Sequence, residues 1–277
     1  MLSKREWFFQ EHSSSNLLCC PYCHGGLVRH DDTLVCTNRH VINVNRKGFV
    51  NFLSRPVQSE YDHALFESRR HILDSGIYAE VIRRILTICE QENGTVVDCG
   101  CGEGWWLSQF LSERPKWSGV GIDISRPAIE QATDYRSHAV FAVADLRRIP
   151  VADHATDVVL NILSPASYEE FHRILKPQGK LIKVYPGEHY LQEIRIQRGI
   201  PLYNEGDVYT YLNSHMHIQN IDHITTTYPI RHEDWCALIR MTPLNQNLSD
   251  EERSLLSNEN PGKITIDLYV ASCTADI

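Results

Sequence analysis

From residue 79 onward, short apolar runs of strand length alternate with segments whose apolar residues recur at helical spacing. Residues 79–92 are of the second kind, because their apolar positions lie three and four residues apart and predict an amphipathic helix. Apolar runs predict strands at residues 95–99, 118–123, 139–143, 157–162 and 180–185. Helices are predicted between them at 105–113, 127–135 and 168–175. This alternation predicts an α/β fold with a doubly wound, mostly parallel sheet covered by helices on both faces.

Segments on either side complete this pattern. Residues 221–229 and 263–272 are predicted strands, and residues 233–241 form a predicted helix between them. Residues 64–74 are also predicted to be helical and to stop at Gly76. We therefore expect an N-terminal extension (1–18), a small metal-binding β domain (19–53), a linker with a helix (54–77) and a cofactor-binding domain (78–277).

Cysteine and histidine residues near the N-terminus have the spacing of a metal site. Cys20, Cys23, Cys36 and His40 form a C-x2-C pair, a gap of twelve residues and a C-x3-H pair. Three thiolates and one imidazole suit a tetrahedral Zn²⁺, and four protein ligands leave no open position for catalysis. We therefore predict a structural zinc knuckle. Cys19, which is adjacent to Cys20, is a competing ligand. The alternative to a metal site is a hairpin without metal, but a domain of this size has too small a core to be stable without a cross-link or a bound ion.

The first predicted strand of the large domain ends in a glycine-rich loop. Asp98 precedes Gly100, Gly102 and Gly104, which occupy alternate positions. Ligands of doubly wound sheets bind beyond the carboxyl ends of the strands, and a carboxylate about 20 residues downstream, here Asp123, suits a ribose diol. The glycine spacing differs from the dinucleotide fingerprint G-x-G-x-x-G and leaves no room for a pyrophosphate. We therefore expect a ligand with a ribose but no phosphate, as in S-adenosylmethionine.

Composition and charge narrow the class of protein. No apolar run approaches the roughly 20 residues that a membrane-spanning helix needs. The nine cysteines, an odd number at scattered spacing, argue against a disulfide framework, so we expect a cytoplasmic protein without a membrane partner. Residues 1–60 carry seven Lys and Arg against five Asp and Glu, whereas residues 61–277 carry 20 against 30. This acidic body argues against nucleic acid wrapped over the whole surface but permits a local basic contact.

Several stretches resemble one enzyme family. The loop that starts at Asp98 is similar to that of class I S-adenosylmethionine-dependent methyltransferases. The knuckle, together with residues 46–53, 67–78, 163–165 and 241–243, resembles the bacterial RlmA family. Those enzymes methylate ring nitrogen 1 of a guanine in a hairpin of 23S ribosomal RNA. The resemblance covers roughly residues 17–273.

The resemblance also implies which residues meet the cofactor. The expected cofactor-binding set is Tyr78, Asp98, Gly100, Gly102, Gly104, Trp106, Leu107, Asp123, Asp145, Leu146, Asn161 and Tyr190. The loop at Asp145 and Leu146 should face the adenine, and either His189 or Tyr190 should meet the methionine end. Asn161 and Ser164-Pro165, at the end of the fourth predicted strand, lie where this fold usually holds the target base. Trp105 and Trp106 either stack on that base or pack the first helix.

The leading hypothesis is a zinc-containing rRNA (guanine-N1)-methyltransferase whose partner is a ribosomal RNA hairpin and which, on family resemblance alone, forms a homodimer. Two alternatives are a small-metabolite methyltransferase with a structural zinc lid and a non-catalytic RNA-binding protein. The intact glycines and Asp123 argue against the last. No carboxylate or histidine stands out as a catalytic base. If the knuckle clamps RNA, Arg29, Arg39, Arg46 and Lys47 should contact phosphates.

Overall fold

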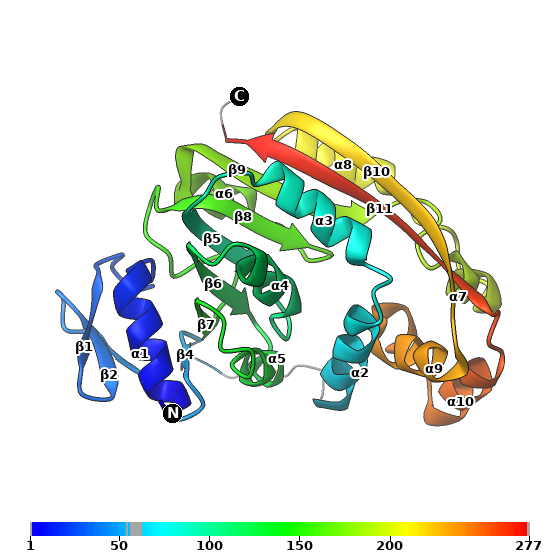
Figure 1. Cartoon of the computed structure of the whole chain (residues 1–277), viewed down its shortest axis with the longest axis horizontal. Coiled ribbons are helices and arrows are strands. Elements are labelled where there is room, and N and C mark those ends of the chain that lie inside the picture. Colours follow the sequence, from blue (N-terminus) through cyan, green and yellow to red (C-terminus); the bar gives the residue numbers. More distant parts are fainter. Residues whose placement is uncertain (1, 54, 56–62, 276–277) are drawn as a thin grey trace.

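An eight-stranded sheet organises the chain, and Figure 1 shows its strands running across the centre of the molecule. The computed structural model describes residues 2–53, 55 and 63–275. The strand order is β10-β11-β9-β8-β5-β6-β7-β4. The pairs from β9 to β4 are parallel, whereas β11 pairs antiparallel with both β9 and β10. The strands are β4 (Phe49–Asn51), β5 (Gly94–Cys99), β6 (Trp117–Asp123), β7 (Ala139–Val143), β8 (Thr156–Ile162), β9 (Leu175–Pro186), β10 (His217–Pro229) and β11 (Lys263–Thr274).

Helices cover both faces of this sheet, because its strands present apolar residues to both sides. Val96 of β5 belongs to one buried cluster and its neighbour Val97 belongs to the other. The first face is covered by α3 (Ala79–Ile88), α4 (Trp105–Glu113), α5 (Arg126–Ala132) and α7 (Gln192–Gln197). The second is covered by α1 (Lys4–Ser15), α6 (Tyr168–Ile174) and α8 (Glu205–Asn213). The predicted doubly wound α/β architecture is therefore confirmed.

A helical group lies at one end of the sheet, below β10 and β11 in Figure 1. It contains α2 (His63–Asp74), α9 (His232–Met241), a short 3-10 helix (Pro243–Asn245) and α10 (Asp250–Asn258). Helices α2 and α9 pack together, and the Asp234 carboxylate of α9 accepts a hydrogen bond from His71 of α2 at 2.7 Å. The linker predicted at 54–63 lies almost wholly outside the described residues. In the part of the chain that is described, no helix is long and apolar enough to cross a membrane.

The N-terminal knuckle is a three-stranded antiparallel sheet of β1 (Leu27–His30), β2 (Thr33–Cys36) and β3 (Val41–Asn43). Residues 49–53, which were expected to belong with it, instead place β4 in the large sheet beside β7. Helix α1 lies between the two sheets, where Phe8 and Phe9 are buried in the same cluster as Leu34 of β2 and Val140 of β7. The knuckle and the large sheet therefore share one hydrophobic core.

Candidate metal centre and cofactor site

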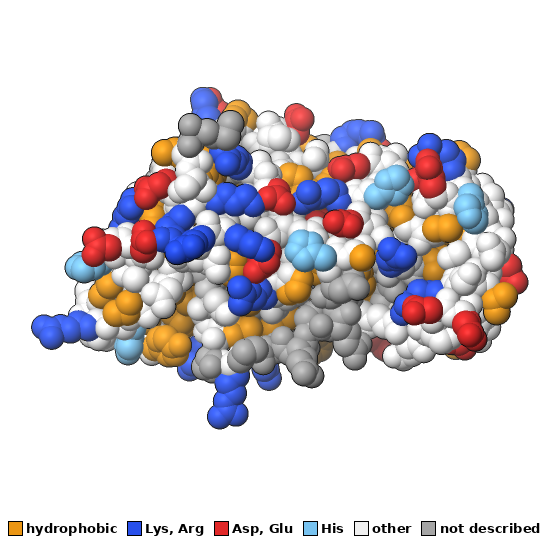
Figure 2. All heavy atoms as spheres, turned by 90° about the horizontal axis from the view of Figure 1, so that it is seen from below, with side chains coloured by type: hydrophobic (Ala, Val, Ile, Leu, Met, Phe, Trp, Pro, Cys, Tyr) orange, Lys and Arg blue, Asp and Glu red, His pale blue; other side chains and the backbone are white. Residues whose placement is uncertain are grey.

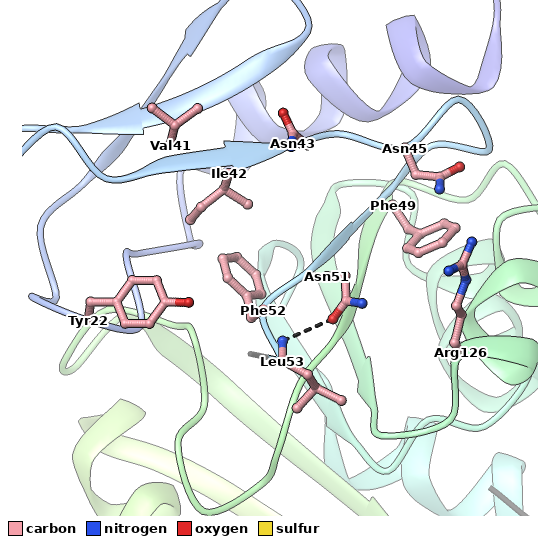
Figure 3. A pocket seen from close by; sticks show the side chains of 10 residues that line it. All are labelled: Tyr22, Val41, Ile42, Asn43, Asn45, Phe49, Asn51, Phe52, Leu53 and Arg126. Carbon is pink, nitrogen blue, oxygen red and sulfur yellow. Dashed lines mark hydrogen bonds between the residues drawn. The ribbon is translucent and has the colours of Figure 1, made fainter. Parts of the chain in front are cut away.

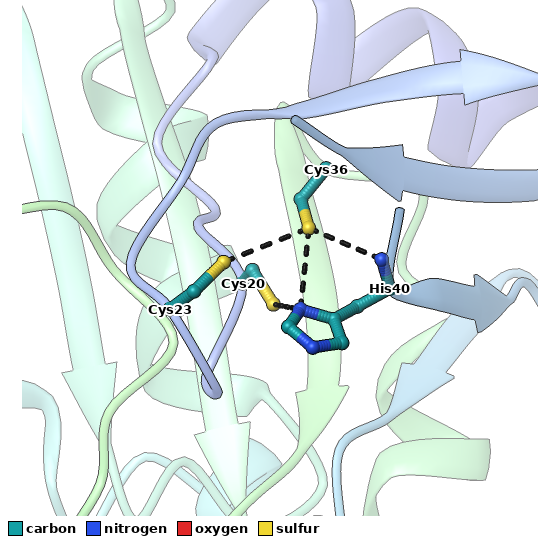
Figure 4. A group of neighbouring side chains, drawn as sticks. All are labelled: Cys20, Cys23, Cys36 and His40. Atoms are coloured by element: carbon teal, nitrogen blue, oxygen red, sulfur yellow. Dashed lines mark hydrogen bonds between the residues drawn. The ribbon is translucent and has the colours of Figure 1, made fainter. Parts of the chain in front are cut away.

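The four predicted metal ligands meet at one end of the knuckle (Figure 4). Their ligand atoms all lie within 4.8 Å of one another. His40 Nδ1 is 3.4 Å from Cys20 Sγ and 3.4 Å from Cys36 Sγ, and the Sγ atoms of Cys23 and Cys36 are 3.6 Å apart. Three sulfur donors and one imidazole nitrogen in so small a volume fit a tetrahedral zinc ion.

Two tight turns carry these ligands. The backbone N–H of His24 donates to Cys20 O at 2.8 Å, and that of Arg39 donates to Cys36 O at 2.9 Å. A hydrogen bond from the backbone of Gly25 lowers the pKa of the Cys23 thiol to about 6, which favours the thiolate that binds metal. Cys19, the competing ligand, lies outside the cluster, and burial raises the pKa of its thiol to about 11. The geometry therefore favours Cys20 over Cys19 as the ligand.

The glycine loop after β5 adopts backbone conformations that require glycine. Gly100, Gly102 and Gly104 have φ values of 85°, 56° and 82°. A Cβ on Gly100 would lie 1.8 Å from Ser164 Oγ, so only glycine fits at this approach. The loop is anchored to β6, because the N–H groups of Gly100 and Cys101 both donate to Ile122 O, at 2.8 and 3.0 Å.

Carboxylates converge around this loop. Asp123, at the end of β6, accepts hydrogen bonds from the backbone N–H of Gly102 at 2.9 Å and of Ser125 at 2.8 Å. Asp98 is 1% exposed, and its Oδ2 has no hydrogen-bond partner among the described residues. Burial, reinforced by the neighbouring Asp123 and Glu103 charges, raises the pKa of Asp98 well above its usual range. A buried carboxylate without a partner is an acceptor for a cationic ligand group.

Aromatic side chains line the loop on the side of α3 and α4. The hydroxyl groups of Tyr78 and Tyr190 are 2.8 Å apart in the interior, and the Tyr78 ring packs edge-on against Trp106. Trp105 packs the helix, since it is buried and its Nε1–H donates to Asp74 Oδ1 at 2.7 Å. Leu107 is fully buried and points toward Gly119 of β6. Its predicted cofactor contact would therefore have to come from its backbone.

The remaining predicted residues lie at the ends of β7 and β8. Asp145 follows β7 and binds the Arg147 guanidinium, which lowers the pKa of that carboxyl. Leu146 reaches the glycine loop, where its Cδ1 lies 4.0 Å from a Cβ placed on Gly100. Asn161 is fully buried, and its Nδ2 donates to Cys99 O and Pro165 O, both at 2.9 Å. Asn161 thus joins β5 to the loop after β8, and its contact with a cofactor stays a prediction.

Two charged residues at this edge were not predicted. Lys183 of β9 is 5% exposed, and its Nζ donates to Asn161 Oδ1 at 2.5 Å and to Ser164 O at 2.6 Å. Burial lowers the pKa of Lys183 to about 8. The Nη1 atom of Arg69, on α2, lies 3.9 Å from Glu103 Oε2 and would lie 3.0 Å from a Cβ placed on Gly102. The sequence signal for Lys183 was a lysine inside an otherwise apolar strand.

Replacement of one metal ligand should remove the metal. We expect Cys36→Ser to lower the zinc content from about one ion per chain to none, because three ligands hold the ion far less tightly. Backbone amides of β1 to β3 should then exchange hydrogen faster, while those of β5 to β9 keep their protection. Metal analysis and hydrogen-exchange mass spectrometry test this. Cys236→Ser, outside the cluster, is the matched control. Full zinc content in Cys36→Ser would contradict the assignment.

Lys183 should make the stability of the fold depend on pH. Its pKa is about 8 in the folded state against 10.5 as the ordinary value, so the unfolded chain binds more protons between these values. Lys183 by itself should therefore contribute a rise of about 3 kcal/mol in the free energy of unfolding from pH 8 to 10.5. Buried thiols with raised pKa values act in the opposite direction, so the comparison with the Lys183 variant isolates this contribution. Lys183→Met should lack this rise, whereas Lys180→Met on the same strand should keep it. Chemical denaturation of the three proteins at several pH values measures the difference, and parallel curves would refute it.

Comparisons with known proteins agree with this geometry. Residues 96–179 match the family model of a methyltransferase domain, and residues 18–61 match that of the RlmA N-terminal zinc ribbon. The chain superposes on the YcgJ protein of Bacillus subtilis with a TM-score of 0.52 at 14% identity, over 72% of this chain and 100% of that one. The BH2331 protein of Bacillus halodurans C-125 also gives a TM-score of 0.52, at 15% identity over 71% and 99% of the two chains. These likenesses concern the fold.

Sequence relatives extend over nearly the whole chain. A 23S rRNA (guanine(748)-N(1))-methyltransferase of Streptomyces fradiae is 31% identical over 268 residues, which are 92% of this chain and 96% of that one. YxjB of Bacillus subtilis (strain 168), provisionally named a 23S rRNA (guanine-N(1)-)-methyltransferase, is 33% identical over 272 residues, 91% and 94% of the two chains. The chain therefore belongs to the RlmA-type family of S-adenosylmethionine-dependent 23S rRNA (guanine-N1)-methyltransferases, with an N-terminal zinc ribbon.

Proposed function

We propose that this enzyme transfers a methyl group from S-adenosylmethionine to ring nitrogen 1 of a guanine in a hairpin of 23S ribosomal RNA. One observation carries this proposal: relatives with that activity in their names align with more than nine tenths of the chain, zinc ribbon and methyltransferase domain together. A small-metabolite substrate would explain the cofactor site but would not explain the zinc ribbon. We also propose that the enzyme acts in the cytoplasm, because its rRNA substrate would be found there. The homodimer and the domain limits stay predictions.

The residues at the carboxyl edge of the sheet fit S-adenosylmethionine. The unpaired Oδ2 of Asp98 offers a buried acceptor for the cationic methionine end, and Asp123 stands where a ribose diol binds in such sheets. Gly100, Gly102 and Gly104 keep the loop free of side chains, so that a ligand can approach its backbone. We assign the cofactor to these residues and to the tyrosine pair of Tyr78 and Tyr190.

Positioning supplies most of the rate in this reaction. When bound, the cofactor supplies an electrophilic methyl group on a sulfonium centre. The chain has to hold the guanine in line with it, which requires a base that is unstacked from the RNA. The loop from Asn161 to Pro165 is suited to this role, since Lys183 binds both Asn161 Oδ1 and Ser164 O. The guanine N1–H must also lose its proton, and we assign no residue as its acceptor.

Basic side chains on the knuckle favour contact with phosphates. Figure 2 shows Lys and Arg side chains spread over the half of the lower face that contains the knuckle, interleaved with acidic ones. Arg29 is paired with Glu6 at 2.9 Å and Lys47 with Glu130 at 2.7 Å. Arg39 and Arg46 are exposed and form no ion pair with the described residues. They are therefore the better candidates for phosphate contacts among the four cations that the sequence suggested.

Loss of Asp123 should weaken cofactor binding. The ribose hydroxyl groups would lose a charged acceptor in Asp123→Ala, and the loop would lose its bond to the Gly102 N–H. We expect the affinity for S-adenosylmethionine to fall about 10- to 150-fold. Isothermal titration calorimetry measures this, with Asp250→Ala on the surface of α10 as the control. Equal affinity in Asp123→Ala and wild type would remove Asp123 from the site.

Transfer of labelled methyl groups tests the proposed reaction itself. Purified enzyme and labelled S-adenosylmethionine should methylate 23S rRNA hairpins, and nucleoside mass spectrometry should identify 1-methylguanosine. Replacement of single guanines by adenosine should abolish the formation of 1-methylguanosine at one position only, because a single guanine is the acceptor. Label that appears in small molecules of a cell extract but in no RNA would instead support the metabolite methyltransferase.

A further inference from the structure

A cavity of about 310 Å³ lies where the knuckle meets the edge of the large sheet (Figure 3). Its walls come from the knuckle turn at Tyr22, from β3, from β4 with the residues on either side of it, and from the start of α5. Side chains for recognition are present on all sides: Tyr22, Asn43, Asn45, Asn51, Phe52 and Arg126. None of the residues predicted to hold the cofactor lines this cavity, so it is a separate site.

The walls combine flat apolar surface with amide groups. Tyr22 is 54% exposed and faces the cavity from the side of Phe52, as Figure 3 shows. The Oδ1 of Asn51 accepts the Leu53 N–H at 2.9 Å, and that of Asn45 accepts the Lys47 N–H at 2.8 Å. The Nδ2 groups of both asparagines have no partner among the described residues. They remain free to bind an acceptor, while the exposed ring of Tyr22 offers a face on which a planar ring can stack.

The rim of the cavity is positively charged. Arg126 donates from Nε to Glu130 at 2.9 Å, and Lys47 donates to the same carboxylate at 2.7 Å. Because two cations share one carboxylate, a net positive charge remains at this rim. Stacking faces, amide groups and a neighbouring cation are the features with which proteins bind single-stranded nucleotides.

The cavity opens at the same edge of the sheet as the glycine loop. Asn51 at the end of β4 lies beside Val143 of β7, which lies beside Asp123 of β6. Strand β5 and its glycine loop come next in this row. With three strand spacings of about 4.8 Å, the two sites are about 14 Å apart. One RNA loop can therefore reach both sites.

We propose that this cavity binds an unpaired nucleotide of the RNA substrate, distinct from the guanine that is methylated. Its base stacks on Tyr22, the asparagine amides contact its edge, and Arg126 contacts its phosphate. The cavity thereby fixes the register of the hairpin on the enzyme. This inference rests on the proposed function, because it concerns the same RNA.

Abasic substitutions in the hairpin test the proposal. In wild type, removal of the base at one nucleotide other than the acceptor guanine should weaken binding about 5- to 150-fold, the range for a lost stacking contact. In the double variant Tyr22→Ala/Asn43→Ala, which should keep its zinc, the same abasic hairpin should bind within about twofold of the intact one, because the contacts to the base are already lost. The matched control Asn38→Ala/Tyr209→Ala, outside the cavity, should retain the full abasic effect. Affinity for S-adenosylmethionine should not change in either variant.

Each other outcome overturns the proposal. If every abasic position has the same effect in wild type and in the cavity variant, no base occupies the cavity. If the cavity variant binds S-adenosylmethionine more weakly but RNA equally well, the cavity belongs to the cofactor site. If wild type methylates no hairpin at all, the proposed function itself fails. That result differs from the first two, in which wild type methylates RNA normally.

Discussion

The contact between the loops that follow β5 and β8 determines the shape of the cofactor edge. Gly100 lies so close to Ser164 that a methyl group at residue 100 would displace the second loop. Asn161 joins the two loops through Cys99 O and Pro165 O, and Lys183 binds Asn161 from β9. Three neighbouring strand ends are thus held by one network of side chains. A buried lysine is costly, and its two short hydrogen bonds offset part of that cost.

Charge divides this edge into two regions. Asp98, Glu103 and Asp123 place carboxylates around the glycine loop, where burial raises the pKa of each. These three carboxylates favour a ligand that carries positive charge, as the sulfonium and ammonium groups of S-adenosylmethionine do. Phosphates are repelled there and attracted to the cations of the knuckle and of α5. The acidic body and an anionic substrate are therefore compatible, because carboxylates and cations occupy different parts of the edge.

Much of the large domain could be predicted from periodicity. Strands β5 to β8 lie within one residue of their predicted limits, since buried parallel strands are continuous apolar runs between glycine and polar turns. The metal ligands were predictable because each pair lies on one tight turn, and the geometry of that turn fixes the spacing of the pair in the sequence. The glycine loop was predictable for the same reason, since positive φ values select glycine at fixed offsets.

What escaped prediction depends on tertiary contacts. Helix α1 has little amphipathic pattern beyond Phe8 and Phe9, and it is stabilised by packing between two sheets. β4 has only three residues, and nothing local indicates that its partner is β7, some 90 residues away. Lys183 stood out in its strand, but its role depends on Asn161 and Ser164, about 20 residues earlier in the chain. Trp105 was ambiguous until its hydrogen bond to Asp74 assigned it to packing.

The shared core changes what a structural metal can do for RNA recognition. Tyr22 lies between the ligands Cys20 and Cys23, and its ring is 5.3 Å from that of His40. The ion that fixes this turn therefore also fixes the aromatic wall of the cavity beside β4. Helix α1 and β4 attach the knuckle to the large sheet, so the turn and the cofactor edge are built on one core. If Tyr22 contacts RNA as proposed, a zinc ion without an open coordination position would contribute to RNA recognition through geometry, because it would hold this side chain at a set distance from the cofactor edge.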